Sequence, residues 1–237
     1  MNIWILTLFP KIFESVFSQS IIKKAQRLKL VKINLVNIRD FSEGKHKTVD
    51  DKPYGGGRGM ILKVDVTVKA LESIKPKPYK ILLSAGGTKY DQKKAEFLSA
   101  KKNLAIVCGH YEGVDSRIEK FADEVISIGD FVLTGGEIAA MVIVDSTVRL
   151  LPRVIKSESL LEESFSKLST FNFSPRFAGE AGQLSTLLEY PHFTRPKVFR
   201  NMKVPKILLS GNHQQIAKWR KEEAVKRTKQ YRPDLLK

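Results

Sequence analysis

The sequence predicts an α/β protein built on a mostly parallel β-sheet. Short apolar runs alternate with amphipathic stretches over the first 150 residues, which is the pattern of successive β-α-β units. The 237 residues allow one large domain or two modest ones, and 42% hydrophobic and 28% charged residues are typical of a soluble globular protein. The expected strands are the apolar runs 3–9, 31–38, 79–83, 104–108 and 125–128.

Four helices are expected between and after these runs. The first covers residues 10–28 and starts at Pro10, a residue that suits the first position of a helix. Amphipathic patterns predict two more at 64–74 and 91–100. The last, 137–150, is rich in Ala, Met, Val and Ile, so we expect it to be buried in the core or, alternatively, at a subunit interface.

The chain changes character after Pro152. Residues 156–188 are rich in Ser, Glu, Phe and Gly and have weak periodicity, which indicates a loop or linker. A basic segment near the C-terminus then predicts a helix, with Ser210 or Asn212 as its N-cap. No internal repeat is visible.

The net charge of +16 favours a polyanionic partner, with nucleic acid ahead of an anionic membrane surface. A general excess of lysine is the alternative explanation. The distribution argues against it, because residues 195–237 contain 13 Lys and Arg against 3 Asp and Glu, a net +10 in 43 residues.

The compartment is predicted from cysteine content and hydropathy. The single cysteine, Cys108, cannot form an internal disulfide and fits a reducing compartment such as the cytoplasm. Because it lies in an apolar run, we expect a buried structural residue before a catalytic one. The apolar run 138–144 is far too short to span a membrane, and the N-terminus lacks the basic lead-in of a signal peptide.

Glycine-rich segments mark the candidate sites. The first, 49–60, holds four glycines in five residues together with Asp50 and Asp51, which favours a functional loop over a flexible surface loop. It is not a phosphate-binding P-loop, because no Gly-Lys-Ser/Thr follows.

Three further loops, 84–87, 108–115 and 127–137, follow the third, fourth and fifth predicted strands. Ligands of open α/β sheets bind at the carboxyl ends of the strands, so these loops are expected to form one pocket lined largely by backbone. Leu82, Leu83, Ile128 and Leu133 would supply its apolar walls. No G-x-G-x-x-G turn is present, which favours an adenosine ligand over a pyrophosphate-bearing dinucleotide.

Ionisable side chains near these loops are candidates for acid–base chemistry. The glycine loops carry Glu112, Asp115, Asp130 and Glu137, and the segment L-L-E-E-S-F in the linker carries Glu163. The four histidines are scattered and have no partners at zinc-binding spacing, and no Ser-His-Asp nucleophile motif is found.

The ordered set of motifs resembles one family. D-D-K-P-Y-G-G-G-R-G-M, C-G-H-Y-E-G-V-D, S-I-G-D-F-V-L-T-G-G-E, P-H-F-T-R-P and L-L-S-G-N-H are similar, in register over nearly the whole chain, to the bacterial tRNA (guanine-N1)-methyltransferases of the TrmD family. The resemblance implies a SPOUT-type parallel sheet with a trefoil knot at the C-terminal end of the N-terminal domain, and a small, mostly helical C-terminal domain. It also implies a homodimer with shared active sites, S-adenosylmethionine as methyl donor, and N1 of guanosine 37 in tRNA as acceptor.

The resemblance also assigns domains and roles. A methyltransferase domain would cover residues 1–157, a linker longer than the family norm 158–188, and a basic tRNA-binding domain 189–237. Glu163 would be the general base, Arg149 the catalytic arginine, and Glu112 a carboxylate linked to magnesium dependence. The implied cofactor contacts are Leu83, Gly109, Tyr111, Gly113, Ser127, Ile128, Gly129, Asp130, Phe131, Val132, Leu133, Gly135 and Gly136. The implied RNA contacts are His46, Asp50, Gly59, Arg195, Lys218 and Arg220.

The chain departs from the family pattern at several positions, which keeps other interpretations open. Glu163 stands where the family has Asp, Ala85-Gly86 where it has Pro-Gln, and Phe131 and Phe193 where Tyr is common. One alternative is a relative that binds RNA and S-adenosylmethionine without turnover. Another is a SPOUT methyltransferase of ribosomal RNA. A dinucleotide oxidoreductase is disfavoured by the missing glycine fingerprint.

Overall fold

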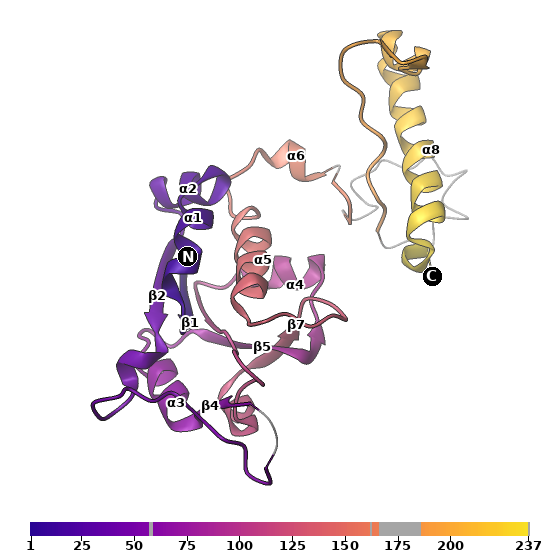
Figure 1. Cartoon of the computed structure of the whole chain (residues 1–237). Coiled ribbons are helices and arrows are strands. Elements are labelled where there is room, and N and C mark those ends of the chain that lie inside the picture. Colours follow the sequence, from indigo (N-terminus) through magenta and orange to yellow (C-terminus); the bar gives the residue numbers. More distant parts are fainter. Residues whose placement is uncertain (57–58, 162, 166–185, 237) are drawn as a thin grey trace. The chain divides into compact units, whose positions relative to one another are not determined.

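The computed structural model describes residues 1–56, 59–161, 163–165 and 186–236 (Figure 1). The chain divides into two compact units, Met1–Ile155 and Lys156–Lys237. The predicted three-part division at 157 and 188 stays a prediction, because most of the proposed linker lies outside the described residues.

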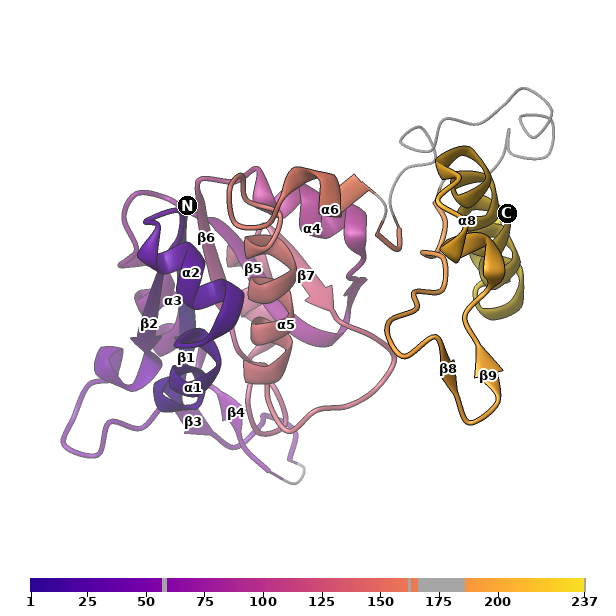
Figure 2. The same cartoon turned by 90° about the horizontal axis from the view of Figure 1, so that it is seen from above.

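A five-stranded parallel sheet forms the centre of the first unit (Figure 2). Its strands are β1 (Asn2–Thr7), β2 (Lys32–Asn37), β5 (Tyr79–Lys89), β6 (Asn103–Val107) and β7 (Glu124–Ser127), in the order β2-β1-β6-β5-β7. All neighbouring strands run parallel. The predicted α/β class and all five predicted strands are therefore confirmed.

Both faces of the sheet are buried, as expected for parallel strands covered by helices. Successive residues of a strand point to opposite faces, and along β6 Leu104 and Ile106 join one apolar cluster while Ala105 and Val107 join the other. Helix α3 (Val64–Glu72) covers the second face. Helices α1 (Glu14–Phe17), α2 (Ser20–Arg27), α4 (Gln92–Ser99) and α5 (Glu137–Val148) pack on the first.

The predicted helix over residues 10–28 was wrong in its continuity. The segment forms a 3-10 turn η1 (Pro10–Phe13), then α1, then α2. The break has a local cause, since Gln19 is extended with φ −129° and ψ 167° and Ser20 has a φ of 47°. Each piece still buries apolar side chains, with Phe13, Phe17 and Ile22 in the core.

A second correction concerns residues 84–87, which do not follow β5 but lie within it. The register of β5 against β7 shifts there, so that Leu83 and Thr88 both pair with Ile126. Gly87 makes this possible, because a Cβ at that position would lie 2.6 Å from the carbonyl carbon of Ile126. The four residues thus form an irregularity that bends the strand beside β7.

The expectation that α5 is buried holds for one face only. Ala140, Ile143 and Val144 are buried against the sheet. Ile138 and Val142, one helical turn apart, remain 47% and 42% exposed. An apolar helix with an uncovered apolar face fits the alternative expectation of a subunit interface.

Short elements complete the first unit. They are η2 (Ile38–Phe41), the antiparallel pair β3 (Asp50–Asp51) and β4 (Ile61–Leu62), and η3 (Ser116–Phe121). The glycine-rich segment 49–60 therefore connects two paired strands, and of its residues 57 and 58 lie outside the described part. Leu62 also bridges to Val114, which places this segment beside the loop after β6.

The second unit contains α6 (Ser157–Leu161), β8 (Val198–Phe199), β9 (Met202–Lys203), η5 (Lys206–Leu209), α8 (His213–Tyr231) and η6 (Pro233–Leu236). Its small core joins Leu187, Tyr190 and Ala224 to Trp219. Of the two proposed caps of the long helix, Asn212 is the N-cap, because its side chain accepts a hydrogen bond from the Gln215 N–H at 3.1 Å.

Candidate active site

A cavity of about 340 Å³ opens at the carboxyl ends of β5, β6 and β7 and at the N-terminus of α5. The three predicted loops line it together. Of the residues expected to contact a cofactor, those bordering the cavity are Leu83, Gly109, Tyr111, Gly113, Ser127, Ile128, Gly129, Phe131, Val132, Leu133, Gly135 and Gly136. Leu82 borders it as well, so all four expected apolar wall residues lie there.

Backbone hydrogen bonds tie the loops to one another. The N–H of Gly136 donates to the carbonyl of Gly109 at 2.8 Å, and His110 bridges to Gly135. The Ser127 hydroxyl donates to the Gly129 carbonyl at 3.0 Å and accepts from the Gly129 N–H at 3.3 Å. The chain that leaves β7 therefore returns to the chain that leaves β6, and the cavity wall is largely backbone.

Asp130 does not line the cavity with its neighbours. Its carboxylate is exposed and lies 3.9 Å from the ammonium nitrogen of Lys89. A carboxylate in that position is solvated, and its ion pair contributes little stability.

Glu112 borders the cavity and connects it to the segment 49–60. Its N–H donates to the Met60 carbonyl at 3.1 Å, and its side chain occupies the space where a Cβ of residue 59 would stand, which Gly59 leaves free. Two predicted RNA contacts, Gly59 and Asp50 of β3, are thereby placed in the segment next to the cavity. Among the described residues, no group of three or more His, Cys, Asp and Glu side chains is arranged to hold a metal ion.

Asp115 has a structural task at the start of η3. Its carboxylate accepts the Arg117 backbone N–H at 2.9 Å and pairs with the guanidinium at 2.6 Å. These bonds hold the pKa of Asp115 below its usual range, with the guanidinium hydrogen bond as the main cause. This carboxylate therefore caps a helix turn.

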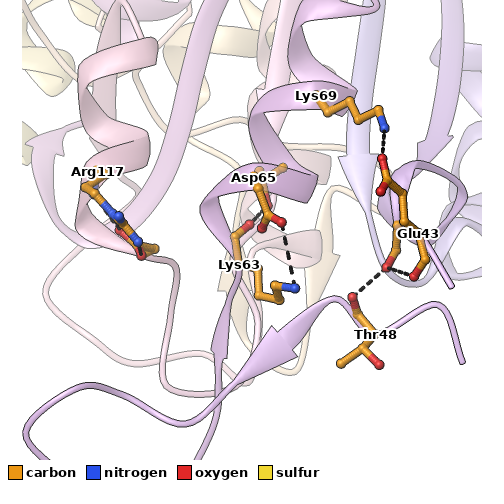
Figure 3. Close-up of polar contacts among 9 residues, drawn as sticks. Glu43, Thr48, Lys63, Asp65, Lys69 and Arg117 are labelled. Atoms are coloured by element: carbon orange, nitrogen blue, oxygen red, sulfur yellow. Dashed lines mark hydrogen bonds and ion pairs between the residues drawn. The ribbon is translucent and has the colours of Figure 1, made fainter.

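The loop that carries His46 is tied to the body of the unit (Figure 3). The Ser42 hydroxyl donates to the Thr48 carbonyl at 2.6 Å, which closes the loop, and Lys69 of α3 donates to Glu43 at 2.8 Å. The lysine lowers the pKa of Glu43 by this hydrogen bond. His46 itself is exposed at the end of this loop.

Three predicted RNA contacts lie in the second unit. Arg195 and Lys218 are exposed, and Lys218 lies 3.9 Å from Glu222 one turn along α8. Arg220 differs, because it is partly buried and its guanidinium lies 4.7 Å from the centre of the Tyr190 ring. Packing against the small core is thus part of what Arg220 does.

Arg149, the predicted catalytic arginine, does not border the cavity. Arg149 follows the last residue of α5, whose first residue borders the cavity loops. A helix of 12 residues is roughly 18 Å long, so Arg149 lies far from the glycine loops. Glu163 belongs to the second unit, which is not placed relative to the first.

Sequence reasoning missed a buried polar chain beneath the cavity. The Thr7 hydroxyl donates to a Glu137 carboxylate oxygen at 2.7 Å, and the other oxygen lies 3.7 Å from His110 Nδ1. Glu137 was already a candidate for acid–base chemistry, whereas His110 was noted only for lacking zinc-binding partners, although its place in a glycine loop was a usable signal. Thr7 carries no such signal, because its role depends on a contact 130 residues away.

Cys108 is fully buried close to Glu137, a member of this buried polar group. Burial, with the nearby Glu137 charge as a smaller cause, raises the pKa of its thiol well above the usual range. A buried, protonated thiol is a poor nucleophile. The expectation of a structural cysteine is confirmed.

A parallel α/β sheet with a backbone-lined cavity at its carboxyl edge defines the class of α/β proteins that bind small ligands at the strand ends, and the cavity lacks a dinucleotide fingerprint. Comparison with known proteins is more specific. The chain belongs to the tRNA (Guanine-1)-methyltransferase TrmD family, whose model matches residues 1–237.

Curated relatives cover the whole chain. A tRNA (guanine-N(1)-)-methyltransferase of Geobacillus kaustophilus is 52% identical over 241 residues, covering 100% of this chain and 91% of the relative. Proteins of the same name from Carboxydothermus hydrogenoformans and Bacillus pumilus are each 50% identical, again over 100% of this chain and over 88% and 92% of their own length. In the described part of the chain, no helix is long and apolar enough to cross a membrane.

Proposed function

We propose that this protein transfers a methyl group from S-adenosylmethionine to N1 of guanosine 37 in tRNA. The full-length family match carries this conclusion, because it covers the cavity, the linker and the basic C-terminal helix together. The family and the relatives' names support a tRNA (guanine-N1)-methyltransferase.

The cavity suits the methyl donor. Its volume of about 340 Å³ lies in the range of small-molecule sites, and its backbone groups and apolar walls can hold an adenosine without a phosphate-binding motif. Leu83, Ile128 and Leu133 would pack against the adenine, while backbone N–H and C=O groups of the glycine loops would read its edge. When bound, S-adenosylmethionine supplies an electrophilic methyl group.

The acceptor chemistry calls for a base and a cation. Guanine N1 carries a proton at neutral pH, so a carboxylate must accept that proton as N1 becomes a nucleophile. We assign this role to Glu163, since Glu and Asp side chains have similar intrinsic acidity. Arg149 would stabilise the negative charge that develops on O6. Reaching the cavity requires the guanine to leave its stack.

A homodimer would resolve the distance between Arg149 and the cavity. We propose that a second copy contributes its Arg149 and Glu163 to each cavity. The exposed apolar face of α5, with Ile138 and Val142, supports a subunit contact. Phe9, Ile12 and Val16, at η1 and α1, are exposed as well, and η1 contacts α5, so the apolar surface extends beyond the helix.

We include three further features in this proposal: a trefoil knot, a carboxylate linked to magnesium dependence, and a cytoplasmic location. The hydrogen bond between Gly136 and Gly109 and the bridge between Gly135 and His110 support a chain that passes back beside an earlier loop, as a knot needs. Glu112 borders the cavity and would be the carboxylate linked to magnesium. A tRNA substrate and a single thiol both suit the cytoplasm.

Binding of tRNA would rest on both units. Residues 195–221 contain eight Lys and Arg and no Asp or Glu, so this part of the second unit presents positive charge to phosphates. In the first unit, the loop with His46 and the segment with Asp50 and Gly59, which the Glu112 N–H joins to the cavity wall, would contact the anticodon region. The contacts between Lys or Arg side chains of the second unit and phosphates should be sensitive to salt.

Methyl transfer from radiolabelled S-adenosylmethionine to tRNA tests the function. We expect N1-methylguanosine in tRNA with guanosine 37 and no product when adenosine replaces it. Glu163→Ala should lower kcat roughly a hundred- to ten-thousand-fold, whereas Glu163→Asp should retain most activity. Binding of tRNA without turnover would favour a non-catalytic relative that binds RNA and S-adenosylmethionine. Methylation of ribosomal RNA in place of tRNA would favour a SPOUT methyltransferase of ribosomal RNA.

A further inference from the structure

A buried polar chain joins three elements beneath the cavity. Thr7 ends β1, His110 follows β6, and Glu137 is the first residue of α5. The Glu137 side chain is only 5% exposed. It accepts the Thr7 hydroxyl proton at 2.7 Å, and Thr7 in turn accepts the Phe9 N–H at 2.9 Å. A carboxylate at a helix N-terminus is also stabilised by the helix dipole.

His110 is the member of this polar chain that lacks a hydrogen bond. Its Nδ1 atom is buried and has no hydrogen-bond partner among the described residues, although a Glu137 oxygen lies 3.7 Å away. The ring packs against Phe9 at 4.7 Å and Tyr111 at 4.8 Å between centroids, and the residue borders the cavity. An unpaired buried nitrogen is costly, so a movement of less than about 1 Å that completes this hydrogen bond would be favourable.

Gly135 leaves the space that the pair needs. A Cβ at this position would lie 2.5 Å from His110 Nδ1 and would also overlap the Glu137 carboxylate. The neighbouring Gly136 N–H donates to Gly109, directly before His110. The imidazole and carboxylate therefore meet at the point where two cavity loops are joined.

We propose that Glu137 is a positioning residue for cofactor binding. Its carboxylate holds the His110 imidazole, and through it the loops 108–115 and 127–137, in the arrangement that accepts S-adenosylmethionine. Occupation of the cavity closes the 3.7 Å gap between His110 Nδ1 and Glu137 to a hydrogen bond. This inference rests on the proposed function, because it names S-adenosylmethionine as the ligand.

Calorimetric titration with S-adenosylmethionine and steady-state kinetics test the inference. Glu137→Gln keeps the size of the side chain and an acceptor for Thr7 but removes the charge that faces His110. We expect its Kd for S-adenosylmethionine to rise about tenfold or more, with kcat at saturation changed less than threefold. His110→Gln should behave alike, and the double variant should be no worse than the weaker-binding single variant, because the two residues act as one unit.

Glu124→Gln is the matched control. Glu124 is also a largely buried carboxylate of the first unit, paired with Lys94 at 2.6 Å and with the Tyr79 hydroxyl at 3.0 Å, but it does not border the cavity. The Glu124→Gln variant should have a lower thermal midpoint and an unchanged Kd for S-adenosylmethionine. If Kd rises in parallel with lost stability in both variants, or if the His110 and Glu137 effects add, Glu137 has only a structural role and the inference is wrong.

If Glu137→Gln does not fold, two variants of Thr7 test the inference instead. Thr7→Ser keeps the hydroxyl and should bind like wild type, whereas Thr7→Val removes it and should weaken binding severalfold. Equal binding by both would overturn the inference. Failure of the wild-type protein to bind S-adenosylmethionine would instead overturn the proposed function, so the two failures are distinguishable.

Discussion

At Gly136, the N-cap of α5, the chain lies against the backbone that follows β6. A Cβ there would lie 2.8 Å from Cys108 Cα and 3.0 Å from the Gly109 nitrogen, both of which are backbone atoms that cannot rotate away. The motif T-G-G-E therefore has a packing reason in addition to any contact with a ligand. The chain leaving β7 can lie against the chain leaving β6 only without that side chain.

Gly136→Ala is expected to lower the free energy of unfolding by about 1–3 kcal/mol, because the added methyl overpacks this contact. Gly86→Ala is the matched control, since a Cβ at Gly86 would meet only the Ser84 hydroxyl at 4.0 Å. Urea unfolding of both variants measures the difference. Equal stability of the two variants would contradict the close approach.

The Cys108 thiol links stability to alkaline pH. Its pKa is raised well above the usual range in the folded protein, mainly by burial. In the unfolded chain a thiol ionises near pH 8.5, so above that pH the unfolded state binds fewer protons than the folded state. The free energy of unfolding should fall as pH rises, by at most about 1.4 kcal/mol per pH unit from this group.

Cys108→Ala removes this contribution. Urea unfolding of the wild type and of Cys108→Ala between pH 7.5 and 9.5 should give a steeper decline for the wild type. The partly buried tyrosines, among them Tyr79 with a pKa raised to about 12 by burial first and by Glu124 second, lower stability equally in both proteins, so the difference between the two curves reports Cys108. Parallel curves would show that Cys108 ionises equally in both states.

At the scale of elements, α8 is the longest helix described and carries much of the positive charge of the second unit. Its apolar contacts with the small core are few, so its N-cap matters. The Asn212 side chain accepts the Gln215 N–H, and Ser210 accepts the Asn212 N–H at 3.1 Å before the helix begins.

Asn212→Ala should therefore destabilise α8 by about 1 kcal/mol, within the usual range of about 0.5–2 kcal/mol for a lost N-cap. Ser210→Ala, which removes a hydrogen bond outside the helix, should cost less. Amide hydrogen exchange in the first turn of α8 would report both effects. A larger effect of Ser210→Ala would mean that the cap is assigned to the wrong residue.

The exposed face of α5 leads to a prediction about assembly. If Val142 and Ile138 are covered by a second copy, the protein in solution should have twice the 26.8 kDa mass of one chain. Val142→Lys would place a charge in that contact and shift the equilibrium towards single chains, with loss of methyl transfer. Light scattering measures the mass. A single-chain wild type with full activity would refute the shared site.

At the scale of the whole molecule, the charge of +16 is concentrated near the C-terminus, where residues 195–237 carry a net +10. The proposed RNA contacts from that region bind phosphates, and counterion release makes such binding salt-dependent. Affinity for tRNA should therefore fall steeply as salt concentration rises, whereas affinity for S-adenosylmethionine should change little.

Neutralising Arg195 and Lys218 together, as Arg195→Gln with Lys218→Gln, should reduce the slope of log K against log salt by about 1–2. The exposed Lys93→Gln in α4 is the control, and it should leave the slope unchanged. Fluorescence anisotropy with labelled tRNA from 50 to about 300 mM salt gives the slopes. Identical slopes for all three proteins would place the phosphate contacts elsewhere.

Much of the first unit was predictable from local patterns. The five apolar runs became the five strands, and the helices at 64–74 and 91–100 appeared within a residue or two of their expected bounds as α3 and α4. These elements are encoded in hydrophobic periodicity, which each segment carries by itself. The continuous helix over 10–28 failed because the backbone angles of Gln19 and Ser20 break the segment in its middle, although its helical pattern of apolar residues continues on both sides.

The loops of the candidate site were also found from their glycines and from their place after strands, because parallel strands bring their carboxyl ends to one edge. Asp130 was expected among them but faces solvent, since neighbouring residues of one loop can point in different directions. Thr7, His110 and Glu137 could not be found as a group, because their contact joins residues up to 130 positions apart.

By itself the sequence determined the class of fold, the strands, the glycine loops and, through its ordered motifs, the family. Those properties depend on local periodicity or on similarity along the chain. Only the tertiary structure decided which groups meet: that Glu137 is buried between Thr7 and His110, that Arg149 lies at the far end of α5 from the cavity, and that one apolar face of α5 stays uncovered. The physical reason is that burial and charge pairing are set by segments distant in the sequence, which local patterns do not encode.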